Sequence, residues 1–508
     1  MIAVFFLILS ASLLWCPDES LDLWWHLKTG QLMWEQGRIF TTDIFSYTAF
    51  GNEWINHEWL SEIIYSFLYK HGGTMGLVSF RCLIGFLIGY LSYRCSFFLS
   101  ANRSVSLLLS TLSFWLASPR FMDRPAMFSS LFFLCLLFLV IGVQSGSLPK
   151  KISFCFLGLF VLWVNLHGAF MLGLIFLFIF WFREISQSII HFQGFSSHRG
   201  ILFLLILGAC LLNPYGYQIF LFPFQDLSLS VPIKNTIEWL SIFDPALKGL
   251  AERKYFPFVF LAVGLGLALN RKKLNIEYLL ILGLMTCMAF RAVRFFSDFV
   301  LIAAPLLSGA LSSWIPQRRL VAYLFFLLSL IFLGSSVASA LKRGSLESQT
   351  LRQLQSLSPT YTPELINFLT DHQVVGRIFN DLNLAPSFIF LKGPQQKVFA
   401  DGRHSVYGND LLEKYYRALS HPEDEFLNLE DRYGPFDSVI IGRGAPLKFK
   451  PLQQYLWENP RWELVYFSNK GYIYLKKRQK FDSLITQYRI KIPPPPLLAQ
   501  MPYLEIKD

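Results

Sequence analysis

Charged residues are scarce in this chain. Asp, Glu, Lys and Arg together make up 16% of its 508 residues, whereas apolar residues make up 53% and the mean hydropathy is +0.42. So low a share of charge excludes an ordinary soluble protein, and so high an apolar share excludes an intrinsically disordered one. The composition therefore predicts an integral membrane protein.

The motifs of several large enzyme classes are also missing. The sequence has no Walker loop, no dinucleotide-binding glycine fingerprint after a strand and no serine-centred nucleophile elbow. A nucleotide-driven or hydrolase reaction therefore has no support.

The seven cysteines are an odd number without metal-ligand spacing, so we interpret them as small apolar residues. Much of the net charge of +11 lies in short loops between apolar segments, which fits membrane topology better than nucleic-acid binding.

Eleven hydrophobic spans can be drawn through the chain, several of them shorter than the roughly 20 residues that cross a bilayer. The spans lie near residues 2–16, 76–93, 104–118, 126–143, 152–166, 168–182, 200–213, 255–270, 275–290, 297–314 and 319–341. The first is interpreted as a signal anchor, with a cleaved signal peptide as the alternative. Basic residues collect in the short loops after the even-numbered spans, which predicts a cytoplasmic N-terminus and an outer C-terminus. These residues are Arg94, Arg103, Lys150, Lys151, Arg183, Arg199, Arg271, Lys272, Lys273, Arg318 and Arg319.

The chain divides into a transmembrane domain, a soluble domain and a tail. Residues 1–344 hold the spans, a long first outer loop at 17–75 and a second outer loop at 214–254. In the soluble part, helical and strand patterns alternate, which predicts a small extracytoplasmic α/β domain over 345–480. The proline-rich tail, 481–508, is expected to be poorly ordered. We predict helices over 21–36, 57–70, 363–370, 411–419 and 451–458, strands over 377–380, 397–400 and 438–441, and a hairpin over 463–476.

Nearly all the unusual polar residues fall in loops at one membrane face, between an odd-numbered span and the next. A bundle without chemistry at this face has no need to gather acids, histidines and arginines there. We therefore predict a membrane enzyme that acts on a charged head group. The residues are Asp22, His57, Glu58, Arg120, Arg124, His167, Asn213, Glu238, Arg291 and Arg294.

Two carboxylates are the candidate catalytic groups. Asp22 follows the first span, where it could act as a general base toward a hydroxyl or amine, with His26 on the same helix face as a substrate-binding residue. The alternative for Asp22 is a charge that favours the start of a helix. Glu58 is the second acid and His57 a binding residue beside it, although both could simply occupy the first turn of a helix.

Arginines occupy two short outer turns. Arg120 and Arg124 precede the fourth span, and Arg291 and Arg294 lie between the ninth and tenth. Because a guanidinium is a planar fork suited to phosphate oxygens, these pairs could bracket a phosphate leaving group. The alternative is contact with lipid phosphates at the ends of the spans. Arginines at the outer face run against the positive-inside bias, which favours the functional interpretation.

Three further motifs are weaker candidates. The stretches at 165–168 and 213–216 each place an amide before a glycine, which favours structural turns, with His167 as a binding candidate. Glu238 could belong to a lid in the second outer loop. Asp401, Gly402 and Arg403 follow a predicted strand, where α/β folds often place binding residues, but an ordinary turn with an ion pair explains them equally well.

Several stretches of sequence together resemble a group of bacterial multi-pass proteins. The group is similar to the C-type glycosyltransferase superfamily, which includes oligosaccharyltransferases and lipid-linked mannosyl- and arabinosyltransferases. The resemblance covers most of residues 20–480. The matching stretches are Asp22-Leu-Trp-Trp-His-Leu-Lys-Thr-Gly30, Thr42-Asp-Ile-Phe-Ser-Tyr-Thr48, Asn56-His-Glu-Trp-Leu60, Arg124-Pro125, Asn165-Leu-His-Gly168, Asn213-Pro-Tyr-Gly216 and Asp401-Gly-Arg403.

The resemblance implies a C-type glycosyltransferase fold in the inner (cytoplasmic) membrane and a sugar donor carried on a polyprenyl phosphate or diphosphate. It also implies an acidic base in the first outer loop, where Asp22 is the matching position. The acceptor could be a lipid, a glycan or a protein. Many superfamily members carry paired acids at this position, but here Asp22 is followed by Leu and Trp, so a divalent cation such as Mg or Mn stays an open expectation. The Trp-Trp-Asp motif of oligosaccharyltransferases is absent, so we do not infer recognition of a peptide sequon.

Two other functions compete with a glycosyltransferase that uses Asp22 as its base. A transporter or flippase for a lipid-linked saccharide would need a polar path, yet the spans hold few ionisable groups besides Arg81, and no internal repeat is visible. A non-catalytic subunit of an envelope assembly could gather the same polar residues merely to bind head groups.

Overall fold

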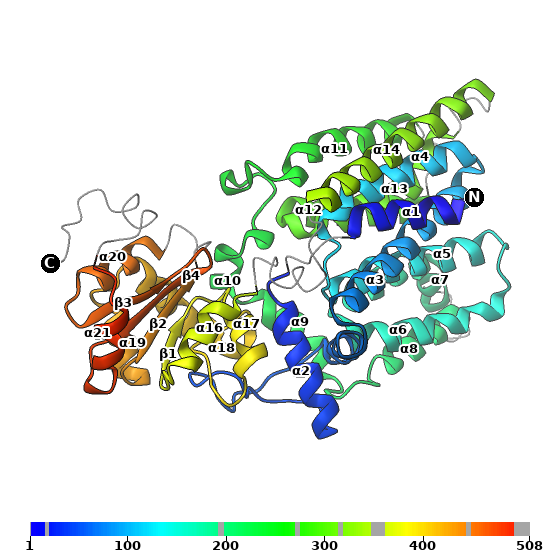
Figure 1. The fold of residues 1–508 in the computed structure, drawn as a ribbon. Helices are drawn as coiled ribbons and strands as arrows, with labels where there is room; N and C mark the ends of the chain where they lie inside the picture. The colour runs from blue at the N-terminus through cyan, green and yellow to red at the C-terminus, as the bar shows by residue number, and fades with distance from the viewer. Residues whose placement is uncertain are drawn as a thin grey trace. The chain divides into compact units, whose positions relative to one another are not determined.

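The computed structural model describes residues 2–15, 20–190, 198–269, 275–312, 319–346, 361–442 and 449–491. The chain forms two compact units. The first, which we call the helical unit, comprises Met1–Asp18, His57–Pro223 and Ile233–Leu351. The second, the α/β unit, comprises Glu19–Asn56, Phe224–Pro232 and Arg352–Asp508. Figure 1 shows the elements of both.

Each of the eleven predicted spans falls on a helix of the helical unit, although the number that cross a membrane remains a prediction. By length and composition, three helices among the described residues can cross a bilayer: Trp59–Ser100, Ala126–Gln144 and Val293–Leu311. The helices of the unit are α1 (Ile2–Leu14), α3 (Trp59–Ser100), α4 (Arg103–Ala117), α5 (Ala126–Gln144), α6 (Cys155–Leu166), α7 (Phe170–Ile190), α8 (His198–Ala209), α9 (Gln218–Leu227, which runs on into the α/β unit), α11 (Ala251–Leu269), α12 (Ile276–Arg291), α13 (Phe296–Leu311) and α14 (Arg319–Leu346), with short 3-10 turns η1 (Ser118–Arg120), η2 (Lys150–Phe154), η3 (Ile237–Trp239), η4 (Pro245–Leu247) and η5 (Val293–Phe295).

Helix α3 lies in the middle of this bundle and packs against α1, α4, α5 and α13 (Figure 1). Its glycines allow α1 to approach closely, because a Cβ on Gly85 would lie 2.4 Å from Leu14 Cδ1 and one on Gly89 would lie 2.5 Å from Phe6 Cδ1. Small residues four positions apart are a common device for tight packing between membrane helices. The helix also breaks at Gly73 (φ 56°, ψ −151°), as expected from the predicted end of the 57–70 helix.

Arg81, the ionisable residue noted inside a predicted span, is part of a buried ion pair. Its Nη1 lies 3.3 Å from Asp123 Oδ2, and both side chains are only 2% exposed. Its Nη2 also donates to the carbonyl of Leu14 at 3.0 Å. A charge in such surroundings is tolerated because it is paired and hydrogen-bonded. Arg81 therefore ties α1 and α3 to the turn before α5.

The α/β unit is built on a four-stranded sheet with the order β1-β2-β4-β3. The strands are β1 (Ile378–Asn380), β2 (Ser438–Gly442), β3 (Trp462–Phe467) and β4 (Gly471–Lys476). Strands β1 and β2 run parallel, with Phe379 beside Val439, whereas β4 is antiparallel to both its neighbours. The predicted α/β arrangement and the hairpin over 463–476 are confirmed. The helices of the unit are α2 (Leu23–Gln36), α10 (Ser230–Asn235, shared with the helical unit), α16 (Pro363–Asp371), α17 (Ala385–Lys392), α18 (His404–Ser420), α19 (Glu425–Tyr433), α20 (Lys450–Glu458) and α21 (Asp482–Tyr488), with the 3-10 turn η7 (Gln479–Phe481).

Most of the first outer loop packs into the α/β unit. Helix α2, predicted over 21–36, packs on α17, and the ring of Trp24 lies 5.2 Å from that of Phe390. The predicted strand 397–400 is wrong, because its pairing is an isolated parallel bridge between Val398 and Ser46 of the outer loop. The expected disorder of the tail is wrong for its first part, where α21 forms, and residues 492–508 lie outside the described residues.

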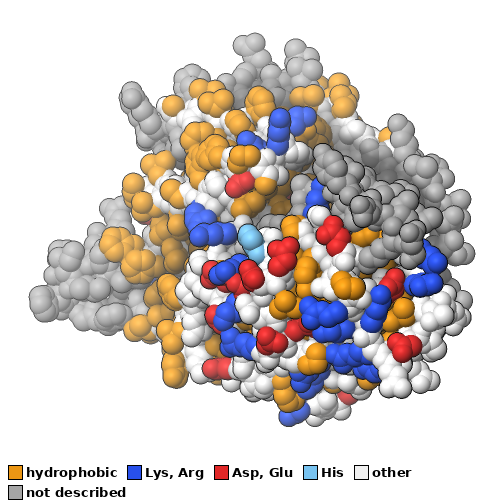
Figure 2. Space-filling model, turned by 90° about the vertical axis from the view of Figure 1, so that its left-hand side faces the viewer, with side chains coloured by type: hydrophobic (Ala, Val, Ile, Leu, Met, Phe, Trp, Pro, Cys, Tyr) orange, Lys and Arg blue, Asp and Glu red, His pale blue; other side chains and the backbone are white. Residues whose placement is uncertain are grey.

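The surfaces of the two units differ in character. On the side of the molecule where Figure 1 labels α19, α20 and α21, Figure 2 shows basic and acidic side chains interspersed. The helical unit instead exposes large apolar side chains along its helices, as expected where lipid is the solvent. Those more than 60% exposed on α11 are Phe258, Leu261 and Leu265. These exposed apolar faces support the prediction of an integral membrane protein.

Candidate functional site

Two motifs singled out in the sequence lie against each other in the helical unit. The indole Nε1 of Trp59, at the start of α3, donates to Asn165 Oδ1 near the end of α6 at 2.9 Å. Two positions further along α3, the hydroxyl of Ser61 donates to the carbonyl of Leu166 at 2.6 Å. The amide of Asn165 also donates to the carbonyls of Val161 and Leu212. These bonds fix the end of α6 against the start of α3.

The neighbouring residues of both motifs form a group of two histidines and one acid. Glu58 Oε1 lies 3.6 Å from His57 Nε2 and 3.7 Å from His167 Nε2. The ring of His57 packs on Phe222, with 4.2 Å between the ring centroids. A Cβ on Gly168 would lie 3.1 Å from His57 Cδ2, so the glycine leaves room for this ring. The stretch at 165–168 is therefore more than a turn, because it builds the surroundings of Glu58.

His167 is held by residues that sequence reasoning missed. Ser129 Oγ lies 2.7 Å from His167 Nδ1 and accepts from Trp163 Nε1 at 2.8 Å. The backbone amide of Ala169 also donates to Nδ1, at 3.3 Å. Burial lowers the pKa of His167 well below its ordinary value, and the nearby charges of His57, Arg294 and Arg124 lower it further. His167 is therefore neutral at physiological pH.

The arginines predicted to bind phosphate converge on one carboxylate. Glu238 Oε2 accepts from Arg120 at 3.1 Å and from Arg124 at 3.0 Å, and Glu238 Oε1 accepts from Arg294 at 3.3 Å. We call these four residues the arginine cluster. The fourth predicted arginine, Arg291, ends α12 with an exposed side chain. The structure thus unites members of both predicted arginine pairs and places Glu238 between them.

Electrostatics keep the acid of the arginine cluster ionised. Burial alone would raise the pKa of Glu238, but Arg124, Arg294 and Arg120 outweigh it and hold that pKa well below its ordinary value. The guanidinium of Arg294 also lies over the ring of Trp239, 4.4 Å from its centroid. Glu238 was expected to belong to a lid. In the structure it is a counter-ion shared by three arginines.

Sequence reasoning also missed Asp298, in the first turn of α13. Its Oδ1 accepts from Ser130 Oγ at 2.6 Å, and it lies within the electrostatic reach of Arg120 and Arg294. An acid inside an apolar helix is itself a signal of function in membrane proteins, and this signal could have identified Asp298. Asn213, by contrast, occupies the predicted turn, where its Oδ1 accepts from the amide of Tyr215 at 2.8 Å.

Asp22, the candidate base, belongs to the α/β unit. It stands at the N-cap of α2 without a side-chain capping bond, and its Oδ1 accepts from Trp25 Nε1 at 3.3 Å. A Cβ on Gly402 would lie 3.0 Å from the same oxygen, so the Asp401-Gly402-Arg403 turn approaches the carboxylate closely. His26 is 2% exposed and its ring lies 3.7 Å from that of Trp25, so packing accounts for its position.

The two charged residues of that turn form a buried network with the first outer loop. Arg403 donates through Nε and Nη2 to Asp401, and through Nη2 to Asp43 Oδ1 at 2.6 Å. Tyr407 donates to Asp401 at 2.8 Å. Burial would raise the pKa of Asp401, but Arg403 outweighs it and lowers that pKa. The charged pair is thus structural, and it ties the outer loop around Asp43 to the α/β unit.

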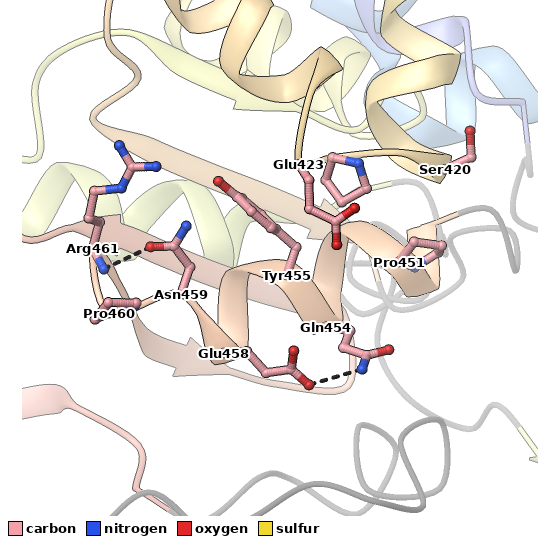
Figure 3. A pocket seen from close by; sticks show the side chains of 10 residues that line it. Ser420, Glu423, Pro451, Gln454, Tyr455, Glu458, Asn459, Pro460 and Arg461 are labelled. Atoms are coloured by element: carbon pink, nitrogen blue, oxygen red, sulfur yellow. Dashed lines mark hydrogen bonds between the residues drawn. The ribbon is translucent and has the colours of Figure 1, made fainter.

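An open hollow of about 410 Å³ lies elsewhere in the α/β unit, where α20 and its neighbours meet. Figure 3 shows Glu458 hydrogen-bonded to Gln454 and the amide of Arg461 donating to Asn459. None of the predicted site residues lines this hollow. Its lining residues are Ser420, Pro422, Glu423, Pro451, Gln454, Tyr455, Glu458, Asn459, Pro460 and Arg461.

A divalent cation does not fit the candidate residues. Within the described parts of the chain, no three His, Cys, Asp or Glu side chains are grouped so that they could hold a metal ion. Glu238 is paired with three arginines, and Asp298 lies within the electrostatic reach of two of them, so a cation at either acid would be repelled.

No family model matches this chain, and no curated protein matches it in sequence. Solved structures do match it. The Archaeoglobus fulgidus oligosaccharyltransferase tethered to an acceptor peptide matches with a TM-score of 0.57 and 10% identity, over 98% of this chain and 76% of that one. The same organism's AglB, with an inhibitory peptide and a dolichol-phosphate, matches with a TM-score of 0.51 and 11% identity over the same shares.

ArnT from Cupriavidus metallidurans, bound to undecaprenyl phosphate, matches with a TM-score of 0.49 and 11% identity, over 94% of this chain and 97% of that one. At such low identities, the likeness to the oligosaccharyltransferase establishes the fold alone. It covers nearly the whole chain, and it confirms at the level of the fold the resemblance found in the sequence. The chain therefore has the fold of the C-type glycosyltransferases.

Proposed function

We propose that the protein is an integral membrane glycosyltransferase that moves a sugar from a polyprenyl phosphate or diphosphate donor to an acceptor at the outer membrane face. The observation that carries the proposal is the arginine cluster. Three guanidiniums from two separate turns share one carboxylate, in a helical unit that exposes large apolar side chains. Such an arrangement suits an anionic lipid head group.

The charge balance of the cluster favours an added anion. Three arginines face two acids, Glu238 and Asp298, so one positive charge remains even when both acids are ionised. The side chains of the three arginines are 22–26% exposed, so part of each guanidinium is open to a ligand. Guanidinium forks bind phosphate oxygens with two parallel hydrogen bonds, which are strong because they are charge-assisted.

The fold favours a lipid-linked donor over a soluble one. The matching AglB structure contains a dolichol-phosphate, which is a phosphate on a long isoprenoid chain. In this chain the three arginines lie in short turns between helices of an apolar bundle, as a head group with its lipid tail in the bilayer would require. The sugar and the acceptor class are not specified by these features.

The reaction has a simple balance of bonds. The acceptor's hydroxyl or amine attacks the anomeric carbon of the sugar and forms the new glycosidic bond. The bond from that carbon to the phosphate oxygen breaks, and the electron pair leaves with the polyprenyl phosphate. We assign the acceptor's proton to Asp22 as general base and give Glu58 an assisting role. The arginine cluster stabilises the negative charge of the leaving phosphate, the kind of contribution that is usually largest in such transfers.

The proposal also includes location and topology. The protein lies in the inner membrane with its N-terminus in the cytoplasm, and the α/β unit and the site residues are extracytoplasmic. Support comes from the basic residues of the short loops that follow the even-numbered spans. Membrane lipids are the surrounding partners, and nucleic acid has no part in the function.

Binding of undecaprenyl phosphate in detergent tests the proposal. We expect Arg124→Gln to weaken this binding about ten- to a hundred-fold, because a charged hydrogen bond contributes roughly 1.5–3 kcal/mol. Lys248→Gln is the matched control, since Lys248 is an exposed base in the second outer loop, outside the arginine cluster. Equal affinities in wild type, Arg124→Gln and the control would contradict the assignment of the cluster to phosphate.

A further inference from the structure

The hydrogen bonds around His167 determine which ring nitrogen carries its proton. The indole of Trp163 can only donate, so Ser129 Oγ is the acceptor in their 2.8 Å bond. Ser129 Oγ also lies 2.7 Å from His167 Nδ1, and its hydroxyl hydrogen points at Nδ1 if that nitrogen carries no proton. The backbone amide of Ala169 also donates to Nδ1, at 3.3 Å. Because a backbone amide can only donate, Nδ1 is an acceptor and Ser129 donates to it as well. A neutral His167 therefore carries its proton on Nε2.

The protonated nitrogen lies beside an acceptor without bonding to it directly. His167 Nε2 is 3.7 Å from Glu58 Oε1, which is beyond the usual length of a hydrogen bond. The two side chains are 13% and 15% exposed, so both are within reach of a ligand. A hydroxyl group accepts one hydrogen bond and donates another, and it therefore matches this adjacent donor and acceptor.

The neighbours of His167 indicate which hydroxyl would be bound. Adjacent residues of α5 connect the two groups, because Ser129 lies 2.7 Å from His167 Nδ1 and Ser130 donates to Asp298. The charges of Arg124 and Arg294 also act on the His167 ring, so the pair lies within electrostatic range of the arginine cluster. A ligand whose phosphate contacts that cluster would present its adjoining group to His167 and Glu58. In a lipid phosphate that carries a sugar, the adjoining group on the side away from the lipid is a ring rich in hydroxyls.

We infer that His167 is a neutral hydrogen-bond donor through Nε2 and that, together with Glu58, it binds a hydroxyl group of the donor's sugar. Ser129 and Trp163 are positioning residues, because they act through His167. The identity of the ligand rests on the proposed function, whereas the position of the proton rests only on the hydrogen bonds. The two parts can therefore be tested separately.

Nitrogen-15 NMR of histidine-labelled protein in detergent tests the position of the proton. The His167 signal is assigned by its loss in His167→Gln. We expect an unprotonated Nδ1 and a protonated Nε2 at neutral pH. In Ser129→Ala, where one of the two donors to Nδ1 is gone, we expect a larger share of the tautomer protonated on Nδ1. A doubly protonated ring, or a proton on Nδ1 in the wild type, would overturn the inference.

Binding measurements test the ligand. The probes are undecaprenyl phosphate and a panel of undecaprenyl-phosphate-linked hexoses and pentoses. The amide nitrogen of Gln can take the place of Nε2, whereas that of Asn lies nearer to Nδ1. We expect His167→Asn to bind the preferred sugar-linked lipid about ten-fold more weakly than wild type, as loss of one buried hydrogen bond implies. His167→Gln should bind nearly as wild type, and undecaprenyl phosphate should bind all three proteins equally.

The other outcomes have separate meanings. Equal weakening by Gln and Asn, or an equal loss for the lipid without sugar, would overturn the role of His167 in binding a hydroxyl. Failure of every sugar-linked lipid to bind the wild type would contradict both that role and the proposed function. The NMR result would remain valid in that case, because it needs no ligand.

Discussion

Trp59 donates a hydrogen bond of 2.9 Å to Asn165, across 106 positions of the sequence. This bond fixes the motif at the start of α3 against the motif at the end of α6, and it brings His167 to within 3.7 Å of Glu58. A helix start and a turn that look unrelated in sequence thus form one group. The geometry of Glu58 therefore depends on hydrogen bonds between neighbouring residues of the two motifs.

Loss of the Trp59–Asn165 bond should destabilise the helical unit. We expect Asn165→Leu to cost about 1–3 kcal/mol, because it leaves the Trp59 indole without its partner, along with the carbonyls of Val161 and Leu212. Thermal unfolding in detergent measures the cost. In a double-mutant cycle, Trp59→Phe should cost less in the Asn165→Leu background than in the wild type. Strict additivity of the two changes would show that the bond contributes nothing.

Gly402 should be required for the correct position of Asp22. A Cβ at residue 402 would lie 3.0 Å from Asp22 Oδ1, so Gly402→Ala must displace the carboxylate by a few tenths of an ångström. We expect a fall in turnover of roughly ten-fold with an unchanged melting temperature, since catalysis is sensitive to such shifts. Gly249→Ala is the control, because no atom lies within 4 Å of its added Cβ. A wild-type rate in Gly402→Ala would argue against a catalytic Asp22.

Arg403 should stabilise the α/β unit. We expect Arg403→Met to destabilise it by about 3–5 kcal/mol, because Asp401 and Asp43 would remain buried without their counter-ion. The loss should appear as a lower midpoint of unfolding and as faster proteolysis of the α/β unit. Arg432→Gln removes an arginine from the exposed pair with Asp410 and should change neither measurement. Equal effects of the two variants would mean that the buried network has no special role.

Asp381 should make the stability of the α/β unit depend on pH. Burial raises the pKa of Asp381 to about 6, despite hydrogen bonds from the amides of Asn383 and Gly442. An acid whose folded pKa is raised stabilises the fold fully below its unfolded pKa of about 4, and this contribution is lost as pH rises through the folded pKa. The loss amounts to about 3 kcal/mol.

Asp381→Asn should remove this pH dependence. Between pH 4 and pH 8, the stability of the variant relative to wild type should rise by about that amount, as measured by the midpoint of unfolding at each pH. The exposed Asp371→Asn in the same unit is the control and should follow the wild type. A constant difference between Asp381→Asn and wild type across this range would show that the carboxyl titrates normally.

The regular elements could be predicted because their signals are local. The periodicity of 21–36 and the alternation about Asn469 and Lys470 were sufficient for α2 and the hairpin. The segment 397–400 has a strand-like composition, yet its only pairing partner is one residue of a distant loop, and no local pattern reports that. Contacts between distant parts of the chain limit the prediction of the site in the same way.

Individual site residues were found where they stood out against an apolar background. Arg120, Arg124 and Arg294 stand out because the positive-inside bias disfavours arginines in outer loops. In the structure, all three contact Glu238. Ser129 was missed because a serine in an apolar helix is ordinary. Its role comes from partners 34 and 38 positions away, which only the fold brings together.

The most direct test of the account is transfer of sugar from a panel of polyprenyl-phosphate-linked sugars in detergent, with wild type beside Asp22→Asn. Both proteins are first tested for binding of undecaprenyl phosphate, so that a folding defect is not mistaken for lost chemistry. The account predicts transfer by the wild type, and binding without transfer by Asp22→Asn. Transfer at the wild-type rate in Asp22→Asn would contradict the assigned base, and donor binding without transfer by the wild type on any acceptor would contradict the glycosyltransferase itself.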